Sequence, residues 1–154
     1  MAFRTLRASD VAVVAALIQE TRQSHVFLFG EKELLALLEA DGKQQCFVWD
    51  EQGIQGAYFM NWEPEGVSVP ETTNFCFLDR MFWSSEHHFD FAHRLFLFSA
   101  QFEATLRGFD DLILPSLFAL GGTQPYLDLG GEEVQFHELS GMQIHSKGIR
   151  FHLH

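Results

Sequence analysis

The sequence predicts one α/β (α+β) domain over residues 1–154, with a mixed, mostly antiparallel sheet and helices on both faces. The chain is long enough to bury a core of its own and too short to expect a second domain. Apolar residues recur at helical spacing in some segments, and they alternate or run together in others. The resulting order, β-α-α-β-β-β-α-β-α-β-β, is typical of helices packed on a sheet.

The first half of the chain is predicted to form a strand, two helices and a hairpin. The expected elements are a strand at residues 3–6, helices at 11–21 and 31–40, and hairpin strands at 46–49 and 54–62. Ser9 or Asp10 is the expected N-cap of the first helix, because a short side chain with an acceptor oxygen satisfies the free N–H groups there. A polar turn at 50–53 connects the hairpin strands.

The second half is predicted to be strand-rich around one long helix. The expected elements are a strand at residues 72–83, a long helix at 89–107, a strand at 112–114, a short helix at 123–129 and an antiparallel pair at 133–139 and 149–153. The strand at 72–83 is mostly apolar, which favours a central position with both faces buried. In the last strand, Ile149, Phe151 and Leu153 share one face and are expected to point inward.

The long helix carries large apolar side chains on more than one side. The residues at i, i+4, i+7 and i+11 are expected to form its core-facing side; they are Phe91, Leu95, Phe98 and Phe102. Three more lie off that side and are expected to serve a second packing surface or a homodimer contact; they are Phe89, Phe96 and Leu97. The chain has 17 Phe residues, which favours either a roomy apolar cleft or such a contact between subunits.

The net charge of -11 argues against nucleic acid as a partner, because the chain would repel a phosphate backbone. A cationic or neutral partner fits better than a polyanion. Cys46 and Cys76 lie in apolar runs and are expected to be buried free thiols. No apolar run approaches the ~20 residues that a membrane span needs. No signal peptide is recognisable, so a cytoplasmic protein is expected.

Four local sequences, in the right order, are similar to those of one known family. They are Phe3-Arg-Thr-Leu-Arg-Ala-Ser-Asp10, Trp49-Asp-Glu-Gln-Gly-Ile-Gln-Gly56, Arg107-Gly-Phe-Asp-Asp-Leu-Ile-Leu114 and Gln124-Pro-Tyr-Leu-Asp-Leu-Gly-Gly-Glu-Glu-Val134. With the order of elements over the whole chain, they resemble the GNAT superfamily of acyl-CoA-dependent N-acyltransferases. The resemblance implies a GNAT-like fold, acetyl-CoA or another acyl-CoA as the cofactor, and a small-molecule amine or a protein amino group as the partner that accepts the acyl group.

The resemblance also implies a reaction and places its catalytic groups. In this family an amine attacks a thioester directly, which needs a base for the ammonium, N–H donors for the carbonyl oxygen and an acid for the thiolate. Tyr126 falls where the family usually carries the acid, and Asp79 falls where a base is sometimes found. The donors are expected to be backbone N–H groups near Met81, Phe82 and Trp83.

The expected cofactor loop departs from the family pattern of Arg or Gln, two residues, Gly, one residue, then Gly or Ala. The best register places His88, Phe91 and His93 at the three defining positions, and no glycine occurs between residues 83 and 107. Phe89 and Phe91 would crowd a diphosphate approaching backbone N–H groups, and Asp90 would repel it. The residues expected to contact the cofactor are Met81, Phe82, Trp83, His88, Phe89, Asp90, Phe91, Ala92, His93 and Arg94.

The altered loop leaves several interpretations open. A protonated His88 or His93, together with Arg94, is an alternative source of positive charge for the phosphates. The loop histidines and Asp90 match no zinc spacing, so no metal site is expected. Besides the transferase, the alternatives are a non-catalytic GNAT-like regulatory or interaction module that has lost CoA binding, and a GNAT-fold binder of a different ligand.

Overall fold

The computed structural model describes residues 2–21, 30–84, 87, 89–116, 119, 122–138 and 145–154. Its elements are β1 (Ala2–Thr5), a 3-10 turn η1 (Ala8–Asp10), α1 (Val11–Thr21), α2 (Glu31–Glu39), β2 (Gln44–Asp50), β3 (Ile54–Asn61), β4 (Val67–Ser68), β5 (Phe75–Trp83), α3 (Phe89–Leu106), β6 (Asp111–Pro115), α4 (Gln124–Leu127), β7 (Glu132–Glu138) and β8 (His145–His152). The predicted order is confirmed, with η1 and the short strand β4 added.

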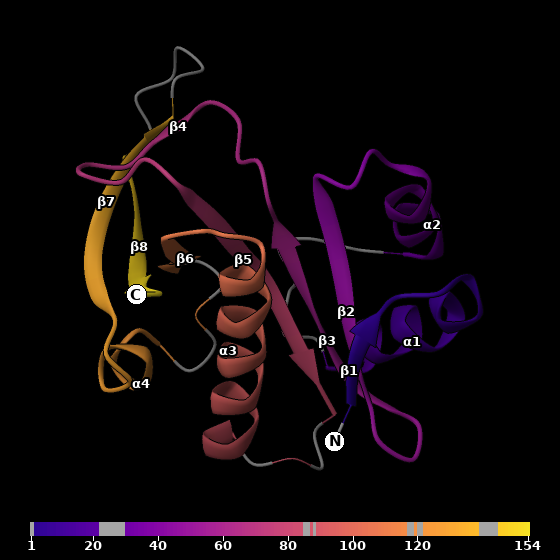
Figure 1. Cartoon of the computed structure of the whole chain (residues 1–154). Coiled ribbons are helices and arrows are strands. Elements are labelled where there is room, and N and C mark those ends of the chain that lie inside the picture. The colour runs from indigo at the N-terminus through magenta and orange to yellow at the C-terminus, as the bar shows by residue number, and fades with distance from the viewer. Residues whose placement is uncertain are drawn as a thin grey trace.

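The eight strands form one sheet in the order β1-β2-β3-β5-β6-β8-β7-β4 (Figure 1). Every neighbouring pair is antiparallel except β5 and β6, which are parallel. A parallel pair needs a long crossover connection, and α3 provides it. The predicted fold class, a mixed and mostly antiparallel sheet with helices on both faces, is therefore confirmed.

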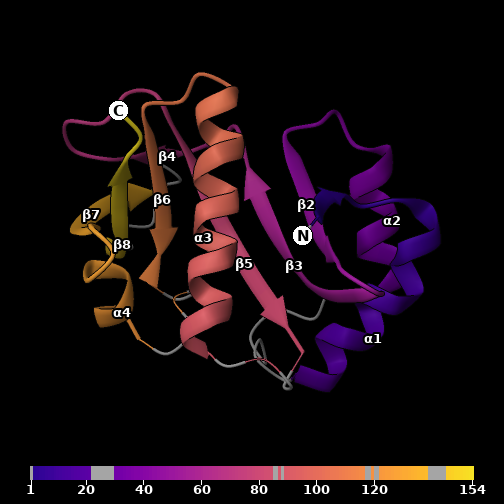
Figure 2. The same ribbon diagram turned by 60° about the horizontal axis from the view of Figure 1, so that its bottom comes forward.

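Two separate cores hold the helices on opposite faces of the sheet. On one face, α3 and Tyr126 of α4 pack against large side chains of β2, β3 and β5. On the other face, Val14 and Ile18 of α1 and Leu34 of α2 pack against Val48 of β2 and the strands beside it. Figure 2 shows α3 crossing in front of the sheet, with α1 and α2 together at its β2–β3 side. Among the described helices, none is both long and apolar enough to cross a membrane.

The side of α3 that packs on the sheet is not the predicted one. The buried residues of the helix are Ala92, His93, Phe96, Leu97, Ala100 and Ala104. The predicted core residues Phe91, Phe98 and Phe102 are exposed instead, and Leu95 is half-buried. The sheet takes the alanine-rich side, spaced by four residues, because small side chains let a helix approach a sheet closely. Sequence periodicity showed two apolar stripes and favoured the one that the structure leaves exposed.

Phe96 and Leu97, expected at a second packing surface or a homodimer contact, belong instead to the core between α3 and the sheet. The burial predicted for β5, for β8 and for the cysteines is confirmed. The strand β5 is almost wholly buried, as expected for a central strand. Ile149 and Phe151 of β8 are buried, while His152 on the opposite side is exposed. Both cysteines are free and buried. The helix α3 ends where Gly108 adopts a positive φ of 85°, a backbone conformation that favours glycine.

Candidate functional site

The strands β5 and β6 part halfway along their length. They pair only through Phe75, Cys76 and Phe77 of β5 among the described residues. Beyond this point β5 continues alongside β3, while β6 continues alongside β8. Figure 2 shows the ends of the two strands pointing away from each other on either side of α3. The hydrogen bonding between β5 and β6 is therefore interrupted beyond Phe77, and this parting of the two strands is called the gap below.

The backbone of β5 turns hydrogen-bonding groups toward this gap. The N–H of Ser84 donates to the carbonyl of Gln55 at 2.8 Å, which fixes the phase of the ladder with β3. Because residues of an antiparallel strand alternate in direction, Phe82 also directs its backbone groups to β3. Met81 and Trp83 then direct theirs to the side of the gap. Such N–H groups are held in place before any ligand arrives.

A β-bulge places Asp79 on β5, beside the beginning of the gap. Phe59 pairs with Arg80 and Met60 pairs with Leu78, so Asp79 is the extra residue. The bulge puts Asp79 and Arg80 together against a small cavity of about 60 Å³ that Phe59 also lines. This cavity is large enough for water but not for a substrate. Its lining includes Phe59, which packs in the core beneath α1, and Met60, which packs in the core beneath α3.

Burial changes the acidity of the Asp79 carboxyl. Desolvation raises the pKa of Asp79 to about 6, and the positive charge of Arg80 offsets part of this rise. Desolvation also lowers the pKa of the Arg80 guanidinium. A carboxylate with a pKa near 6 is ionised at neutral pH and can still accept a proton from an ammonium group or a water molecule. The predicted base therefore has suitable acidity for that role.

Tyr126, the predicted acid, lies in the core on the α3 side. It has no exposed surface, and its ring meets that of His93 edge to face, with 5.4 Å between centroids. Burial raises the pKa of Tyr126 above its ordinary value, which keeps the phenol protonated at neutral pH. Tyr126 therefore contacts His93, another predicted cofactor residue, whereas Asp79 borders the small cavity beside β3.

The remaining predicted cofactor contacts divide by position. Met81, Phe82 and Ala92 are buried, whereas Phe91 and Arg94 are exposed on the first turns of α3. His88 and the side chains of Phe89 and Asp90 lie outside the described part of the chain.

Two features beside this loop were given no role from the sequence: the His87 side chain and a cavity next to it. The His87 ring packs on Trp49 with 4.5 Å between centroids, and its Nε2 lies 3.0 Å from Oε1 of Gln55. A cavity of about 420 Å³ opens alongside, between α1 and the ends of β3 and β5. Its lining residues are Ala12, Val13, Ala16, Leu17, Glu20, Ile54, Gln55 and Ser84. Only tertiary pairing joins these segments, so no local pattern could have revealed the cavity.

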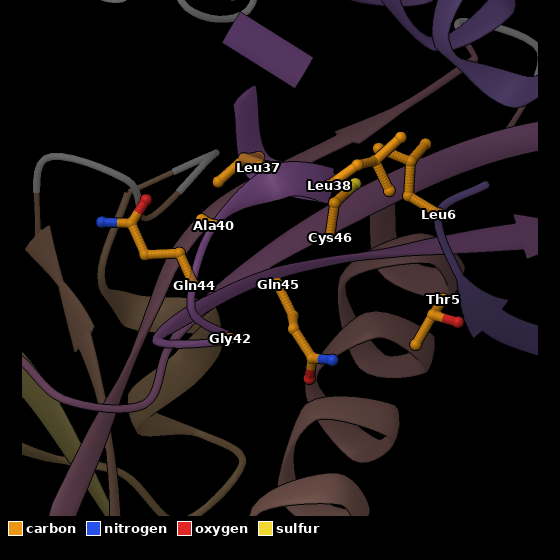
Figure 3. Close-up of a pocket in the computed structure, with 9 residues that line it drawn as sticks. All are labelled: Thr5, Leu6, Leu37, Leu38, Ala40, Gly42, Gln44, Gln45 and Cys46. Atoms are coloured by element: carbon orange, nitrogen blue, oxygen red, sulfur yellow. The ribbon is translucent and has the colours of Figure 1, made fainter. Parts of the chain in front are cut away.

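A separate cavity of about 230 Å³ lies between α2, the end of β1 and the start of β2 (Figure 3). Its lining residues are Thr5, Leu6, Leu37, Leu38, Ala40, Gly42, Gln44, Gln45 and Cys46. Burial raises the pKa of the Cys46 thiol far above neutral pH, so it is a poor nucleophile. The described residues contain no group of three or more metal-ligating side chains.

Solved structures similar to this chain share one fold. The aminoglycoside 6'-acetyltransferase type Ii matches with a TM-score of 0.72 at 11% identity, covering 100% of this chain and 98% of that one. An N-acetyltransferase from Staphylococcus aureus Mu50 matches at 0.70 and 10%, covering 99% and 98%. The protein yncA from Salmonella typhimurium, solved with its cofactor acetyl-CoA, matches at 0.69 and 15%, covering 100% and 94%. No family model and no curated protein matches the sequence. The chain therefore has the GNAT fold.

Proposed function

We propose that this protein is an N-acyltransferase that binds acetyl-CoA or another acyl-CoA in the gap between β5 and β6 and transfers the acyl group to an amine. The observation that carries this proposal is the parting of the two strands beyond Phe77, with backbone groups of Met81 and Trp83 directed to the gap. The fold shared with solved acetyltransferases supports it.

An acyl-CoA matches the chemistry of an open strand edge. Its pantetheine arm is narrow, extended and rich in amide groups, which pair with backbone N–H and C=O groups as an added strand does. The thioester then lies beside β5, where a backbone N–H of Met81 or Trp83 stabilises the negative charge that develops on the carbonyl oxygen. The diphosphate lies toward the N-terminus of α3, whose N–H groups and dipole favour an anion.

Asp79 begins the reaction by taking a proton from the substrate ammonium. The small cavity at Asp79 has room for water, so the proton passes through a water molecule to the carboxylate. The neutral amine attacks the thioester carbon and a C–N bond forms; the C–S bond then breaks, and the nitrogen loses its second proton, which replaces the proton that Tyr126 gives up. Tyr126 supplies the proton that neutralises the departing thiolate, and this role requires the bound cofactor to open the contacts that bury the phenol.

The loop before α3 favours a second candidate function. Phe91 occupies the position where the family has a glycine, and its exposed side chain reduces access to the backbone of the first helical turns. If that crowding excludes the diphosphate, the protein is a GNAT-like module without cofactor, acting through interactions alone. The two candidates differ in whether acyl-CoA is consumed.

Turnover tests the first candidate. The protein is incubated with acetyl-CoA and a panel of polyamines, amino sugars and peptides with free N-termini, and release of the CoA thiol is followed. With an accepted amine, Asp79→Asn is expected to lower kcat/KM about 100-fold or more, because the base is lost. Tyr126→Phe is expected to lower kcat with little change in KM.

Asp110→Asn is the matched control for Asp79→Asn. Asp110 is an exposed carboxylate next to the paired end of β5 and β6, away from the gap. The Asp110→Asn substitution should leave turnover unchanged. Equal turnover in Asp79→Asn and the wild type would remove Asp79 from the mechanism, and absence of transfer to every amine would favour the module without cofactor.

A further inference from the structure

The β-bulge in β5 brings two opposite charges into one small cavity. Consecutive side chains of a regular strand point to opposite faces of the sheet, so sequence neighbours do not normally share a cavity. Because Asp79 is the extra residue of the bulge, Asp79 and Arg80 both line the cavity of about 60 Å³ beside β3. The other described side chains that line it are Gln44, Phe59 and Met60, which carry no charge. Among the described residues, the charged groups of this cavity wall are therefore one carboxylate and one guanidinium.

The charge of Arg80 is held away from water. Its Nε and Nη1 atoms have almost no exposed surface, and desolvation lowers the pKa of the guanidinium below its ordinary value. An arginine keeps its proton under these conditions. In a partly buried site, interactions between charges are stronger than in bulk water. The charge of any group that comes beside Asp79 and Arg80 therefore affects how tightly that group binds.

An acceptor amine that gives its proton to Asp79 also comes close to Arg80. The carboxylate of Asp79 attracts the reacting ammonium group, but a second ammonium group on the same small molecule would lie near a like charge. A carboxylate on the acceptor would instead meet a guanidinium, whose planar fork of N–H donors matches a carboxylate. The cavity has room for such a group, since about 60 Å³ is more than one water molecule needs. The rest of the acceptor stays outside the cavity.

We propose that Arg80 is a specificity-determining residue and that the preferred acceptor is a small amino acid, whose ammonium group lies at Asp79 while its carboxylate is held by Arg80. The two charges of such an acceptor complement those of the bulge. This inference rests on the proposed acyl transfer and adds a substrate class to it. It differs from what the net charge of -11 alone suggests, because an acidic molecule attracts polycations such as polyamines.

A matched set of acceptors tests this preference. β-Alanine, propylamine and trimethylenediamine each present a primary amine on a short carbon chain, which ends in a carboxylate, a methyl group and a second ammonium group, respectively. With acetyl-CoA, kcat/KM is expected to be highest for β-alanine and lowest for trimethylenediamine. In Arg80→Met, the ratio of kcat/KM for β-alanine to that for propylamine should fall at least about tenfold, mainly through KM for β-alanine. Because both values come from one variant, their ratio cancels any loss of folded protein or of efficiency in the base.

Two variants serve as controls for Arg80→Met. Arg80→Lys keeps the positive charge and should retain the order of the acceptors, although a lysine lacks the planar fork and should prefer β-alanine less strongly. Arg7→Met, at an exposed arginine before α1, is the matched control and should leave every ratio unchanged. Equal ratios in Arg80→Met and the wild type would overturn the proposal, as would a wild type that prefers trimethylenediamine.

Binding of the acceptor without transfer separates this proposal from the proposed reaction. The Nε–H signal of Arg80 in the NMR spectrum of nitrogen-labelled protein is assigned by its loss in Arg80→Lys, and β-alanine is then added with and without CoA. A saturable shift of that signal is expected, larger than the shift with propylamine. If the shift occurs but no amine is acetylated, the amino-acid site stands and the transferase does not. If amines are acetylated and β-alanine leaves the signal unmoved, Arg80 does not hold the acceptor and the proposal is overturned.

Discussion

Burial of the ionised Asp79 carboxylate lowers the stability of the folded protein. Burial raises its pKa to about 6 from an ordinary value of 3.8, so ionisation at neutral pH is less favourable in the folded protein than in the unfolded chain. Such a penalty is typical of residues retained for chemistry. The bulge that presents Asp79 could not be predicted from the sequence, because it depends on how β5 aligns with β3. The residue itself was predicted only through the family resemblance.

The raised pKa predicts the pH dependence of turnover. A general base must be ionised, so kcat/KM should rise with pH and level off above an apparent pKa near 6. The pH–rate profile of the wild type with an accepted amine measures this rise in kcat/KM. The rise should be absent from the residual activity of Asp79→Asn. A wild-type profile that is flat between about pH 5 and 8 would contradict the assignment.

The same shift predicts that Asp79→Asn stabilises the protein. A carboxyl whose folded pKa is raised lowers stability as pH increases from its unfolded pKa through about 6, and asparagine removes that ionisation. Urea unfolding at neutral pH should show a gain of roughly 1–3 kcal/mol, and the gain should shrink toward pH 4. A variant that is less stable than the wild type at neutral pH would indicate that Asp79 has a structural role.

Among the elements, the start of α1 shows how a local signal acquires a tertiary role. The sequence predicted Ser9 or Asp10 as an N-cap. In the structure, the buried Asp10 carboxylate links the beginning of α1 to Arg4 of β1 and to the backbone at Arg7. It accepts hydrogen bonds from Arg4 at 2.7 and 2.9 Å and from the Arg7 backbone N–H at 2.8 Å. The hydrogen bond from Arg4 holds the pKa of Asp10 below its ordinary value. The contact ties β1 to the beginning of the helix.

Asp10→Asn should therefore destabilise the protein by about 2–3 kcal/mol at neutral pH, because it breaks a mostly buried ion pair. A lowered carboxyl pKa contributes stability that is present above the unfolded pKa and lost as pH falls through the folded pKa. The difference between variant and wild type should thus shrink in acid. Denaturant unfolding at several pH values checks both parts. Asp50→Asn is the control: it also removes a bond to Arg4, at 3.0 Å, but at a more exposed carboxylate, and should cost less than about 1 kcal/mol.

The packing of α3 on the sheet depends on a glycine of β3. A Cβ at Gly56 would lie 2.5 Å from the backbone oxygen of Phe82 and 2.6 Å from the ring of Phe96. A backbone atom in a paired strand cannot move away, so Gly56→Ala should cost about 3 kcal/mol in thermal or urea unfolding. Gly42→Ala provides the comparison, because its Cβ would meet open space and only its positive φ adds about 1 kcal/mol. Equal costs would show that α3 does not approach β3 this closely.

At the scale of the whole molecule, the sequence predicted the order of elements and the fold class but not their mutual arrangement. Alternation in β8 and helical spacing in α1 are local signals, and they were sufficient to predict a strand and a helix there. The burial of Ala92 rather than Phe91 on α3 was not predicted, because both stripes are apolar and only the sheet selects one. The short strand β4 escaped prediction because two residues carry no period. The resemblance placed backbone donors near Met81, Phe82 and Trp83, but the parting of β6 from β5 depends on tertiary pairing that no local pattern shows.

The central claim is that the gap binds an acyl-CoA, and calorimetric titration of acetyl-CoA into the wild-type protein tests it most directly. The account predicts saturable heat with a dissociation constant in the micromolar range and a melting temperature that rises with excess ligand. Absence of both saturable heat and a shift in melting temperature at millimolar acetyl-CoA would contradict it.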